Sequence, residues 1–167
     1  MIHIYTGKGK GKTTAALGLA VRASGAGLRV YIAQFLKGSQ SSELNSLKRL
    51  KNITVQQFGR KCFIKKEPKQ KDLQEAQRGL QKVQESIEKS KYDVVVLDEL
   101  NVILQLKMID SECVASILRK YGKTTEIVLT GRGAPQKIKR LADYITEMKA
   151  VRHPFTKGAR SRKGIEF

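Results

Sequence analysis

A glycine-rich segment directly after the first few residues most constrains how this chain can fold. Residues 6–14 read TGKGKGKTT, so glycine and lysine alternate ahead of two threonines. They match the spacing GxxxxGK[ST] when Thr6 takes the place of the first glycine. The apolar, β-branched stretch before them predicts a strand, and the pattern from Thr14 to Ser24 predicts a helix. A strand, a glycine-rich turn and a helix in this order are typical of a phosphate-binding loop.

Each part of this turn has a physical role in holding phosphate. Glycines let successive N–H groups point at one centre, and the following helix directs the positive end of its dipole there. Lys12 adds a full charge, and the Thr13 hydroxyl would reach a magnesium ion. The alternative is a flexible basic turn without a ligand. The residues expected to bind ATP are Gly7, Lys8, Gly9, Lys10, Gly11, Lys12, Thr13 and Thr14.

The rest of the chain alternates expected strands with expected helices. Strands are expected at residues 1–6, 28–36, 53–58, 92–97, 126–130 and 144–148, and helices at 14–24, 72–90 and 135–142. The clearest helix is 72–90, where apolar residues recur at spacings of three and four. Strands that are buried on both faces and separated by helices predict a mostly parallel sheet with helices on both faces. The expected fold class is α/β, in a single domain spanning residues 1–167.

Two acidic residues, Asp98 and Glu99, close the expected strand at 92–97. Parallel strands end along one edge of a sheet, and open α/β proteins bind their ligands at that edge. We therefore expect both carboxylates beside the phosphate loop, where they would contact magnesium directly or support its ligands. Alternatively, they stabilise the positive end of a helix that begins near Leu100, and both roles are compatible.

Charge and composition limit the classes of possible binding partner but do not identify one. The chain has 33 Lys and Arg against 15 Asp and Glu, a net charge of +18 that attracts any polyanion. The excess is concentrated at residues 48–71, which are either a binding surface or a solvated basic loop. Apolar runs are far shorter than the roughly 18 residues that span a membrane, and no signal-peptide pattern is present, so we expect a cytoplasmic protein without a membrane partner.

Cysteine and histidine are too sparse for several kinds of chemistry. Cys62 and Cys113 match no disulfide framework or zinc spacing, and we expect two free thiols. The two histidines, His3 and His153, belong to no visible cluster that would activate a nucleophile. A reaction that needs no general base fits this chain well.

Five blocks of sequence resemble the P-loop type of cobalamin (corrinoid) adenosyltransferase. They are GKGKGKTTAALGLAVRASG at residues 7–25, AQFLKG at 33–38, VVLDELN at 95–101, LTGRGAP at 129–135 and HPFTKGARSRKGIEF at 153–167. The blocks run nearly from end to end, and TGRG and GIEF are not shared with general P-loop proteins. The resemblance implies a P-loop NTPase (RecA-like) fold and transfer of the 5′-deoxyadenosyl group of ATP to a reduced corrinoid, with release of triphosphate.

The resemblance also implies roles for individual residues. Co(I) would attack the 5′ carbon of ATP, a displacement that needs positioning and charge neutralisation. Lys12 and Glu99 would be catalytic, and Mg²⁺ would be held by Thr13, Asp98 and Glu99. The corrinoid would contact Phe63, Arg132 and His153. From the residues alone, Phe63 would more often be a core aromatic, and Arg132 and His153 could equally be structural hydrogen-bonding residues. A homodimer and a separate flavoprotein reductant are further implications.

Three other functions stay open on the residues alone. A nucleic-acid-stimulated RecA-like ATPase would explain both loop and charge, but the five Tyr and five Phe are scarcely interleaved with the basic stretch, so nucleic acid is not the expected partner. A small P-loop kinase would need an arginine-bearing lid, which the basic residues at 60–71 imitate. A noncatalytic nucleotide sensor would bind ATP and yield no product.

Overall fold

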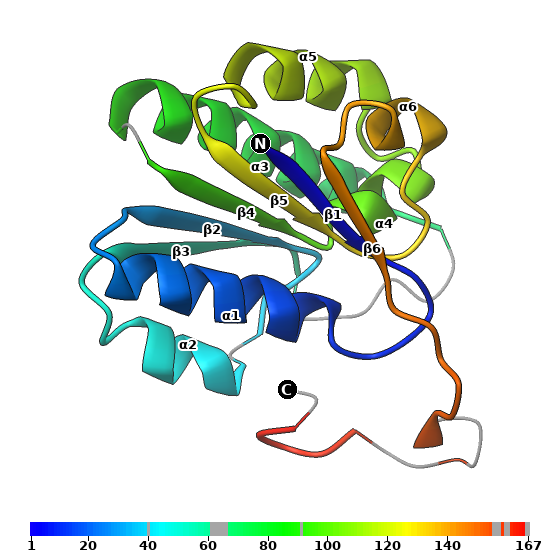
Figure 1. The fold of residues 1–167 in the computed structure, drawn as a ribbon. Helices are drawn as coiled ribbons and strands as arrows, with labels where there is room; N and C mark the ends of the chain where they lie inside the picture. Colours follow the sequence, from blue (N-terminus) through cyan, green and yellow to red (C-terminus); the bar gives the residue numbers. More distant parts are fainter. Residues whose placement is uncertain (40, 61–66, 91, 155–157, 159–160, 166–167) are drawn as a thin grey trace.

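The described strands form one sheet in which every pairing is parallel (Figure 1). A computed structural model describes residues 1–39, 41–60, 67–90, 92–154, 158 and 161–165. The strand order across the sheet is β3-β2-β4-β5-β1-β6. The strands are β1 (Ile2–Thr6), β2 (Val30–Phe35), β3 (Ile53–Phe58), β4 (Val94–Asp98), β5 (Glu126–Thr130) and β6 (Tyr144–Glu147).

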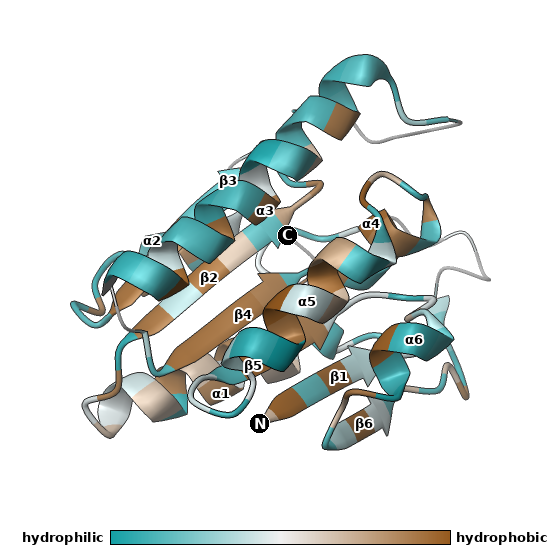
Figure 2. Cartoon of the chain, turned by 90° about the horizontal axis from the view of Figure 1, so that it is seen from above, coloured by the Kyte–Doolittle hydropathy of each residue, from teal (hydrophilic) through white to brown (hydrophobic). Residues whose placement is uncertain are grey.

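Helices cover both faces of this sheet, as the alternation of elements predicted. One face carries α1 (Lys12–Gly25) and α2 (Ser42–Leu47). The other face carries α3 (Gln70–Ser90), α4 (Leu100–Gln105), α5 (Ser111–Tyr121) and α6 (Gln136–Lys139) (Figure 1). Figure 2 shows the apolar strands between helices whose outward surfaces are mostly hydrophilic. The α/β class and the parallel sheet are therefore confirmed.

The two faces of the sheet are packed by side chains of different size. Alternate residues of β2 point to opposite faces, so Tyr31 and Phe35 join the large cluster under α3, α4 and α5. Val30 and Ile32 face α1, which meets the sheet through small residues, Ala16, Ala20 and Ala23. These alanines recur at helical spacing and bring the α1 axis close to the sheet. The first turn of α1 is thereby held over the ends of the strands.

The bounds of several elements differ from the predicted ones. The first helix begins at Lys12 instead of Thr14, because Gly11, with φ 111°, lets the loop turn directly into the helix. The predicted helix at 135–142 is wrong in extent, since Pro135 caps a single turn that ends at Lys139. Helices α2 and α5 were not predicted. Strands β3 and β5 have the predicted bounds.

None of the helices in the described ranges is both long enough and apolar enough to cross a membrane.

Candidate functional site

The glycine-rich loop leads from β1 into α1 at the carboxyl edge of the sheet. Gly7 and Gly11 have φ of 98° and 111°, a backbone conformation that side chains disfavour. Gly9 is required for another reason, the close approach of the segment after β6, to which its N–H donates at the Met148 carbonyl at 2.6 Å. A Cβ at Gly9 would lie 2.7 Å from that carbonyl oxygen. The segment after β6 therefore packs closely against the loop. Glycine is needed at position 9 for space, and at positions 7 and 11 for the backbone conformation.

Lys12 occupies the first turn of α1 and carries the charge of the loop. Its ammonium group donates to the Gly9 carbonyl at 2.6 Å. Burial lowers the pKa of Lys12, the nearby Glu99 carboxylate opposes this effect, and the Arg132 guanidinium adds to it. Three residues predicted for the site, Lys12, Glu99 and Arg132, thus share one electrostatic environment.

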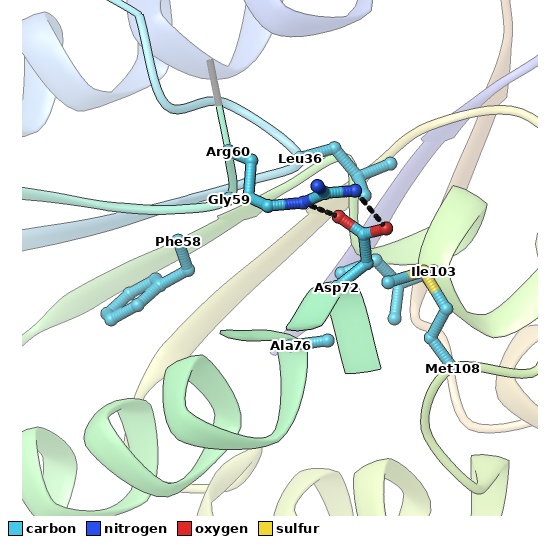
Figure 3. Close-up of a pocket in the computed structure, with 8 residues that line it drawn as sticks. All are labelled: Leu36, Phe58, Gly59, Arg60, Asp72, Ala76, Ile103 and Met108. Atoms are coloured by element: carbon cyan, nitrogen blue, oxygen red, sulfur yellow. Dashed lines mark hydrogen bonds and ion pairs between the residues drawn. The ribbon is translucent and has the colours of Figure 1, made fainter. Parts of the chain in front are cut away.

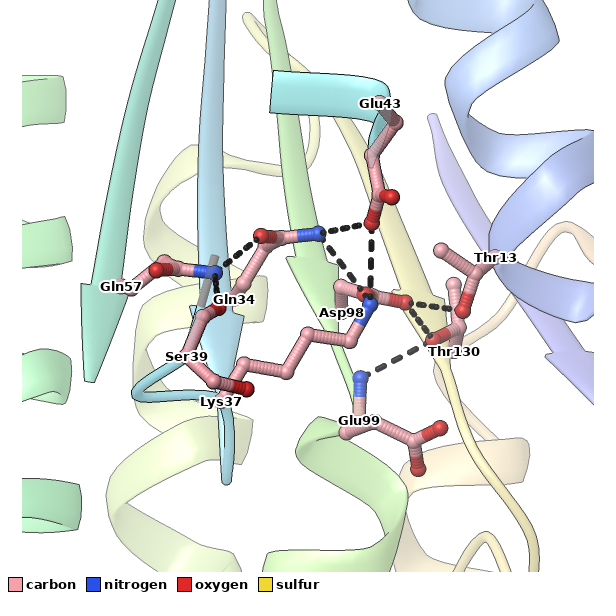
Figure 4. A network of polar contacts seen from close by, with 9 residues as sticks. All are labelled: Thr13, Gln34, Lys37, Ser39, Glu43, Gln57, Asp98, Glu99 and Thr130. Atoms are coloured by element: carbon pink, nitrogen blue, oxygen red, sulfur yellow. Dashed lines mark hydrogen bonds and ion pairs between the residues drawn. The ribbon is translucent and has the colours of Figure 1, made fainter. Parts of the chain in front are cut away.

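Asp98, at the end of β4, is fully buried and lies at the centre of a polar network (Figure 4). Its Oδ1 accepts hydrogen bonds from the hydroxyls of Thr13, at 2.8 Å, and Thr130, at 2.6 Å. Its Oδ2 lies 2.9 Å from the ammonium nitrogen of Lys37. The Thr130 hydroxyl oxygen also accepts from the Glu99 N–H at 2.9 Å. One buried carboxylate therefore connects the phosphate loop with the ends of β4 and β5.

The network continues to α2 and β3 through amide side chains (Figure 4). The Gln34 amide nitrogen donates to Glu43 at 3.3 Å and lies 3.5 Å from Asp98 Oδ2. Its oxygen accepts from Gln57 at 3.0 Å. Although burial alone lowers the pKa of Lys37, the charges of Asp98 and Glu43 outweigh it and raise that pKa.

Glu99 is held in an unusual backbone conformation at the start of α4. Its φ of 62° lies in the left-handed region, which costs a non-glycine residue free energy and is frequent at functional sites. Burial, and then the neighbouring Asp98 charge, raise the pKa of Glu99, against the opposing effect of Lys37, Lys12 and Arg132. Within the described residues, no hydrogen bond or ion pair joins the Glu99 carboxylate to a side chain.

A hollow of about 650 Å³ opens between α1 and α2, beside the loop. Its polar wall includes Thr13, Lys37, Glu43 and Glu99. The C-terminal segment runs back toward α1 and α2, and Ile165 lies at the hollow (Figure 1). The apolar side chains of the wall are Leu17, Val21, Leu47 and Ile165. A hollow with convergent polar groups on one side and apolar side chains on the other suits an organic ligand that carries phosphate.

A small cavity at the ends of β2 and β3 contains an ion pair between Arg60 and Asp72 (Figure 3). Arg60 donates through Nε and Nη2 to the two carboxylate oxygens of Asp72, at 2.6 and 2.7 Å. The Lys69 N–H donates to Asp72 at 2.9 Å, so Asp72 also holds the chain just before α3. Arg60 lowers the pKa of Asp72. Arg60 and the backbone of Lys69 are thus both held by one buried carboxylate.

The structure brings together most, but not all, of the residues predicted for the site. The loop 7–14, Asp98 and Glu99 meet at one edge of the sheet, with Arg132 nearby. Phe63 and Cys62 lie outside the described residues. His153 is partly buried in the segment after β6.

The network also contains residues to which no role was assigned from the sequence. They are Gln34, Lys37, Glu43 and Thr130. Gln34 offered a signal, because an amide in the middle of a buried apolar strand must find a partner inside the protein.

Comparison with known proteins gave matches over the full chain. The sequence profile of the family described as ATP:corrinoid adenosyltransferase BtuR/CobO/CobP matches residues 1–167. A corrinoid adenosyltransferase of Sinorhizobium sp is 33% identical over 171 residues, which cover 100% of this chain and 80% of the relative. The corrinoid adenosyltransferases of Escherichia coli (strain K12) and Salmonella typhimurium (strain LT2) are 30% and 31% identical, covering 100% of this chain and 85% of each relative.

Proposed function

This chain belongs to the ATP:corrinoid adenosyltransferase family, and from that premise we propose that it transfers the 5′-deoxyadenosyl group of ATP to the Co(I) centre of a reduced corrinoid. The observation that carries the proposal is the hydrogen bond of 2.8 Å between Thr13 of the loop and Asp98 of β4, beside the hollow. It joins the glycine-rich loop to the end of β4, beside a cavity with polar groups on one side and an apolar wall on the other. This arrangement supports binding of the triphosphate on the polar side and of the adenosine against the apolar wall.

The fold supports a finer assignment, the P-loop NTPase (RecA-like) type. The loop lies between the first strand and the first helix, and the Thr13 hydroxyl bonds to Asp98 at the end of β4, which β5 separates from β1. Both features are typical of P-loop nucleotide sites. Because a single sheet takes in strands from Ile2 to Glu147, we also propose one domain over residues 1–167.

The reaction needs electrostatic help and positioning from this chain, and no proton transfer. The electron pair of Co(I) forms the new bond to the 5′ carbon, and the bond from that carbon to the triphosphate oxygen breaks with its electron pair on oxygen. Negative charge thus develops on the departing triphosphate, where the loop N–H groups and Lys12 would neutralise it. Burial lowers the pKa of Lys12, and a partly buried charge attracts phosphate more strongly than a fully hydrated one.

The donor set of the site fits Mg²⁺. Among the residues that the structure describes, no three His, Cys, Asp or Glu side chains gather to hold a metal on their own. Mg²⁺ commonly needs only one or two protein oxygens, since phosphates and water complete its shell. Thr13 and Glu99 would supply these oxygens, while Asp98, both of whose oxygens accept from protein groups, would orient Thr13. Bound there, the ion would neutralise charge on the triphosphate.

Contacts to the corrinoid stay predictions. Arg132 is near Lys12 and Glu99, which supports a role at the reacting end of the site. His153 and Phe63 are proposed on the family pattern alone. We also propose a homodimer, a flavoprotein reductant and a cytoplasmic location, which follow from the family pattern and from the composition.

Anaerobic incubation with ATP, Mg²⁺ and a chemically reduced corrinoid tests the proposal. We expect the absorbance change that accompanies alkylation of cobalt, together with one free triphosphate for each adenosyl group transferred. A kinase would yield ADP and a phosphorylated acceptor, an ATPase would yield ADP and free phosphate, and a nucleotide sensor would yield no product. The variant Lys12→Ala tests the role of the loop. It should keep its fold and lose at least about 100-fold in rate, because it removes the positive charge that stabilises the departing triphosphate. Full activity in this variant would refute the assigned role of Lys12.

A further inference from the structure

Lys37 is held in one place by the backbone around it. It follows β2 directly after Leu36, whose φ of 58° turns the chain sharply. The turn packs against the end of β3 so closely that a Cβ at Gly59 would lie 2.8 Å from the Lys37 nitrogen. A non-glycine residue with positive φ persists only where the surrounding structure enforces it. The direction in which the Lys37 side chain leaves the backbone is therefore fixed.

The buried Asp98 carboxylate relies on Lys37 for compensation of its charge. Two threonine hydroxyls bond to Oδ1, and the Gln34 amide lies at 3.5 Å from Oδ2. Lys37, at 2.9 Å from Oδ2, is the one charged donor on this carboxylate in the part of the chain that the structure describes. Burying a charge is costly unless the charge is both paired and hydrogen-bonded, and Lys37 supplies the pairing. Lys37 therefore decides where Asp98 Oδ2 lies.

The orientation of Asp98 controls both residues that we propose as ligands of magnesium. Its Oδ1 accepts a hydrogen bond from the Thr13 hydroxyl, which leaves the oxygen lone pairs of Thr13 free for a cation. The same oxygen accepts a hydrogen bond from the Thr130 hydroxyl, whose own oxygen accepts the Glu99 N–H. A rotation of the carboxylate would disturb all of these contacts together. Anything that fixes Asp98 thus fixes Thr13 and Glu99.

We propose that Lys37 is a positioning residue of the magnesium–triphosphate site, acting through Asp98 on Thr13 and Glu99. The inference rests on the proposed function, because it assumes that this site takes a magnesium–ATP complex. Glu43 assists from α2, since its Oε1 lies 3.5 Å from the Lys37 ammonium nitrogen and 3.3 Å from the Gln34 amide. Helix α2, which forms one side of the hollow, is thereby joined to the ammonium group of Lys37.

The test measures the contribution of magnesium to ATP binding, which a merely structural role would leave unchanged. Dissociation constants for ATP are measured by calorimetry without Mg²⁺ and with it. The ratio of the first constant to the second, which is large when Mg²⁺ strengthens binding, is compared among variants. We expect Lys37→Met to reduce this ratio about 10–100-fold, the usual range when a residue that orients a metal ligand is removed. Lys37→Arg keeps the charge and should recover part of the ratio. Lys48→Met is the matched control, because it removes the same charge from an exposed position at the end of α2.

Each outcome separates the positioning role from the wider proposal. A ratio in folded Lys37→Met equal to that of Lys48→Met would overturn the role of Lys37 and leave the proposed function intact. If Lys37→Met does not fold, the same ratio is measured for Glu43→Gln. A ratio below that of wild type supports the inference, and an unchanged ratio overturns it. Wild-type protein that binds ATP without any help from Mg²⁺ would refute the magnesium site itself, and the role of Lys37 with it.

Discussion

Thr13 and Asp98 are 85 positions apart in the sequence, and their side chains meet through a hydrogen bond of 2.8 Å. Thr13 belongs to the first turn of α1, and Asp98 ends β4. In the sheet, β5 lies between β4 and β1, so the contact spans the edge where these three strands end. The phosphate loop and the acidic strand end are thereby parts of one site.

This contact gives Thr13 a role that serine can fill and valine cannot. Thr13→Val keeps the shape of the side chain but removes the hydroxyl that Asp98 orients. We expect the magnesium-dependent part of ATP binding to fall about 10–100-fold, as it does when a metal site loses an oriented partner. Thr13→Ser should stay close to wild type. Calorimetric titration of ATP at several Mg²⁺ concentrations checks both variants, and equal binding by valine and serine would contradict the assignment.

Gly9 should be intolerant of even one added methyl group. A Cβ there would lie 2.7 Å from the Met148 carbonyl oxygen and 2.8 Å from that of Lys149, and backbone atoms cannot move aside as a flexible side chain can. Gly9→Ala is expected to displace the loop and to weaken ATP binding by at least about tenfold, since the loop N–H groups would no longer converge.

The matched control for this prediction is Gly25→Ala, at the end of α1. Nothing lies within 4 Å of a Cβ at Gly25. The substitution should leave ATP affinity unchanged, and alanine should cost the helix nothing. Affinity in Gly9→Ala that matches Gly25→Ala would mean that the loop does not need the close approach of Met148.

Strands were the part of the fold that the sequence predicted best, because every strand expected from it is present in the sheet. β3 and β5 begin and end at the expected residues, because turn residues bound each of them. The length of helix α6 was overestimated, since nothing in its sequence indicates that the helix ends at Lys139. Helix α5 was overlooked despite two available signals: apolar residues at helical spacing, and Asp110, whose side chain accepts the Glu112 N–H and caps the helix.

The functional site was predictable only where residues follow a buried strand directly. The loop after β1 and the acids that close β4 meet because parallel strands end at one edge of the sheet. Lys37 also follows a buried strand, but its role depends on the positive φ of Leu36. A leucine at that position does not indicate such a backbone conformation. Glu43 joins the site from α2 because of the tertiary position of that helix. Contacts of this kind depend on packing that spacing alone does not reveal.

The pair of Arg60 and Asp72 should make stability depend on acid pH. Arg60 lowers the pKa of Asp72, so the stabilisation is fully present above the ordinary aspartate pKa of about 3.9 and is lost as the pH falls through the lower folded-state value. Asp72→Asn should therefore lower Tm at pH 7, by about 3 °C or more for hydrogen bonds to a charged group. Its difference from wild type should shrink below about pH 3.

An exposed pair provides the control for this pH dependence. Glu75 and Arg78 also form a close ion pair, but their side chains are 31% and 58% exposed. Exposed pairs contribute roughly 0–1 kcal/mol, so Glu75→Gln should change Tm little at either pH. Melting curves at pH 7 and at acid pH distinguish the two pairs. Equal effects of the two substitutions would argue against a special role for the buried one.

Glu99 should lower the stability of the fold while it serves the reaction. Burial and the charge of Asp98 raise its pKa, so the ionised form is disfavoured in the folded protein at neutral pH. The strained φ of 62° adds to this cost, and binding residues commonly carry such a burden. Glu99→Gln keeps the shape and removes the charge. We expect it to raise Tm at pH 7–8 while ATP-dependent adenosylation falls by at least about 100-fold.

The pH dependence of this gain identifies its cause. Wild-type Glu99 becomes protonated as the pH falls below its raised folded-state pKa, so the advantage of the glutamine variant should disappear near pH 4. A gain that persists at acid pH would come from packing and not from charge. A loss of stability at pH 7 would mean that Lys12, Lys37 and Arg132 together compensate the carboxylate, so that Glu99 holds the site together instead of straining it.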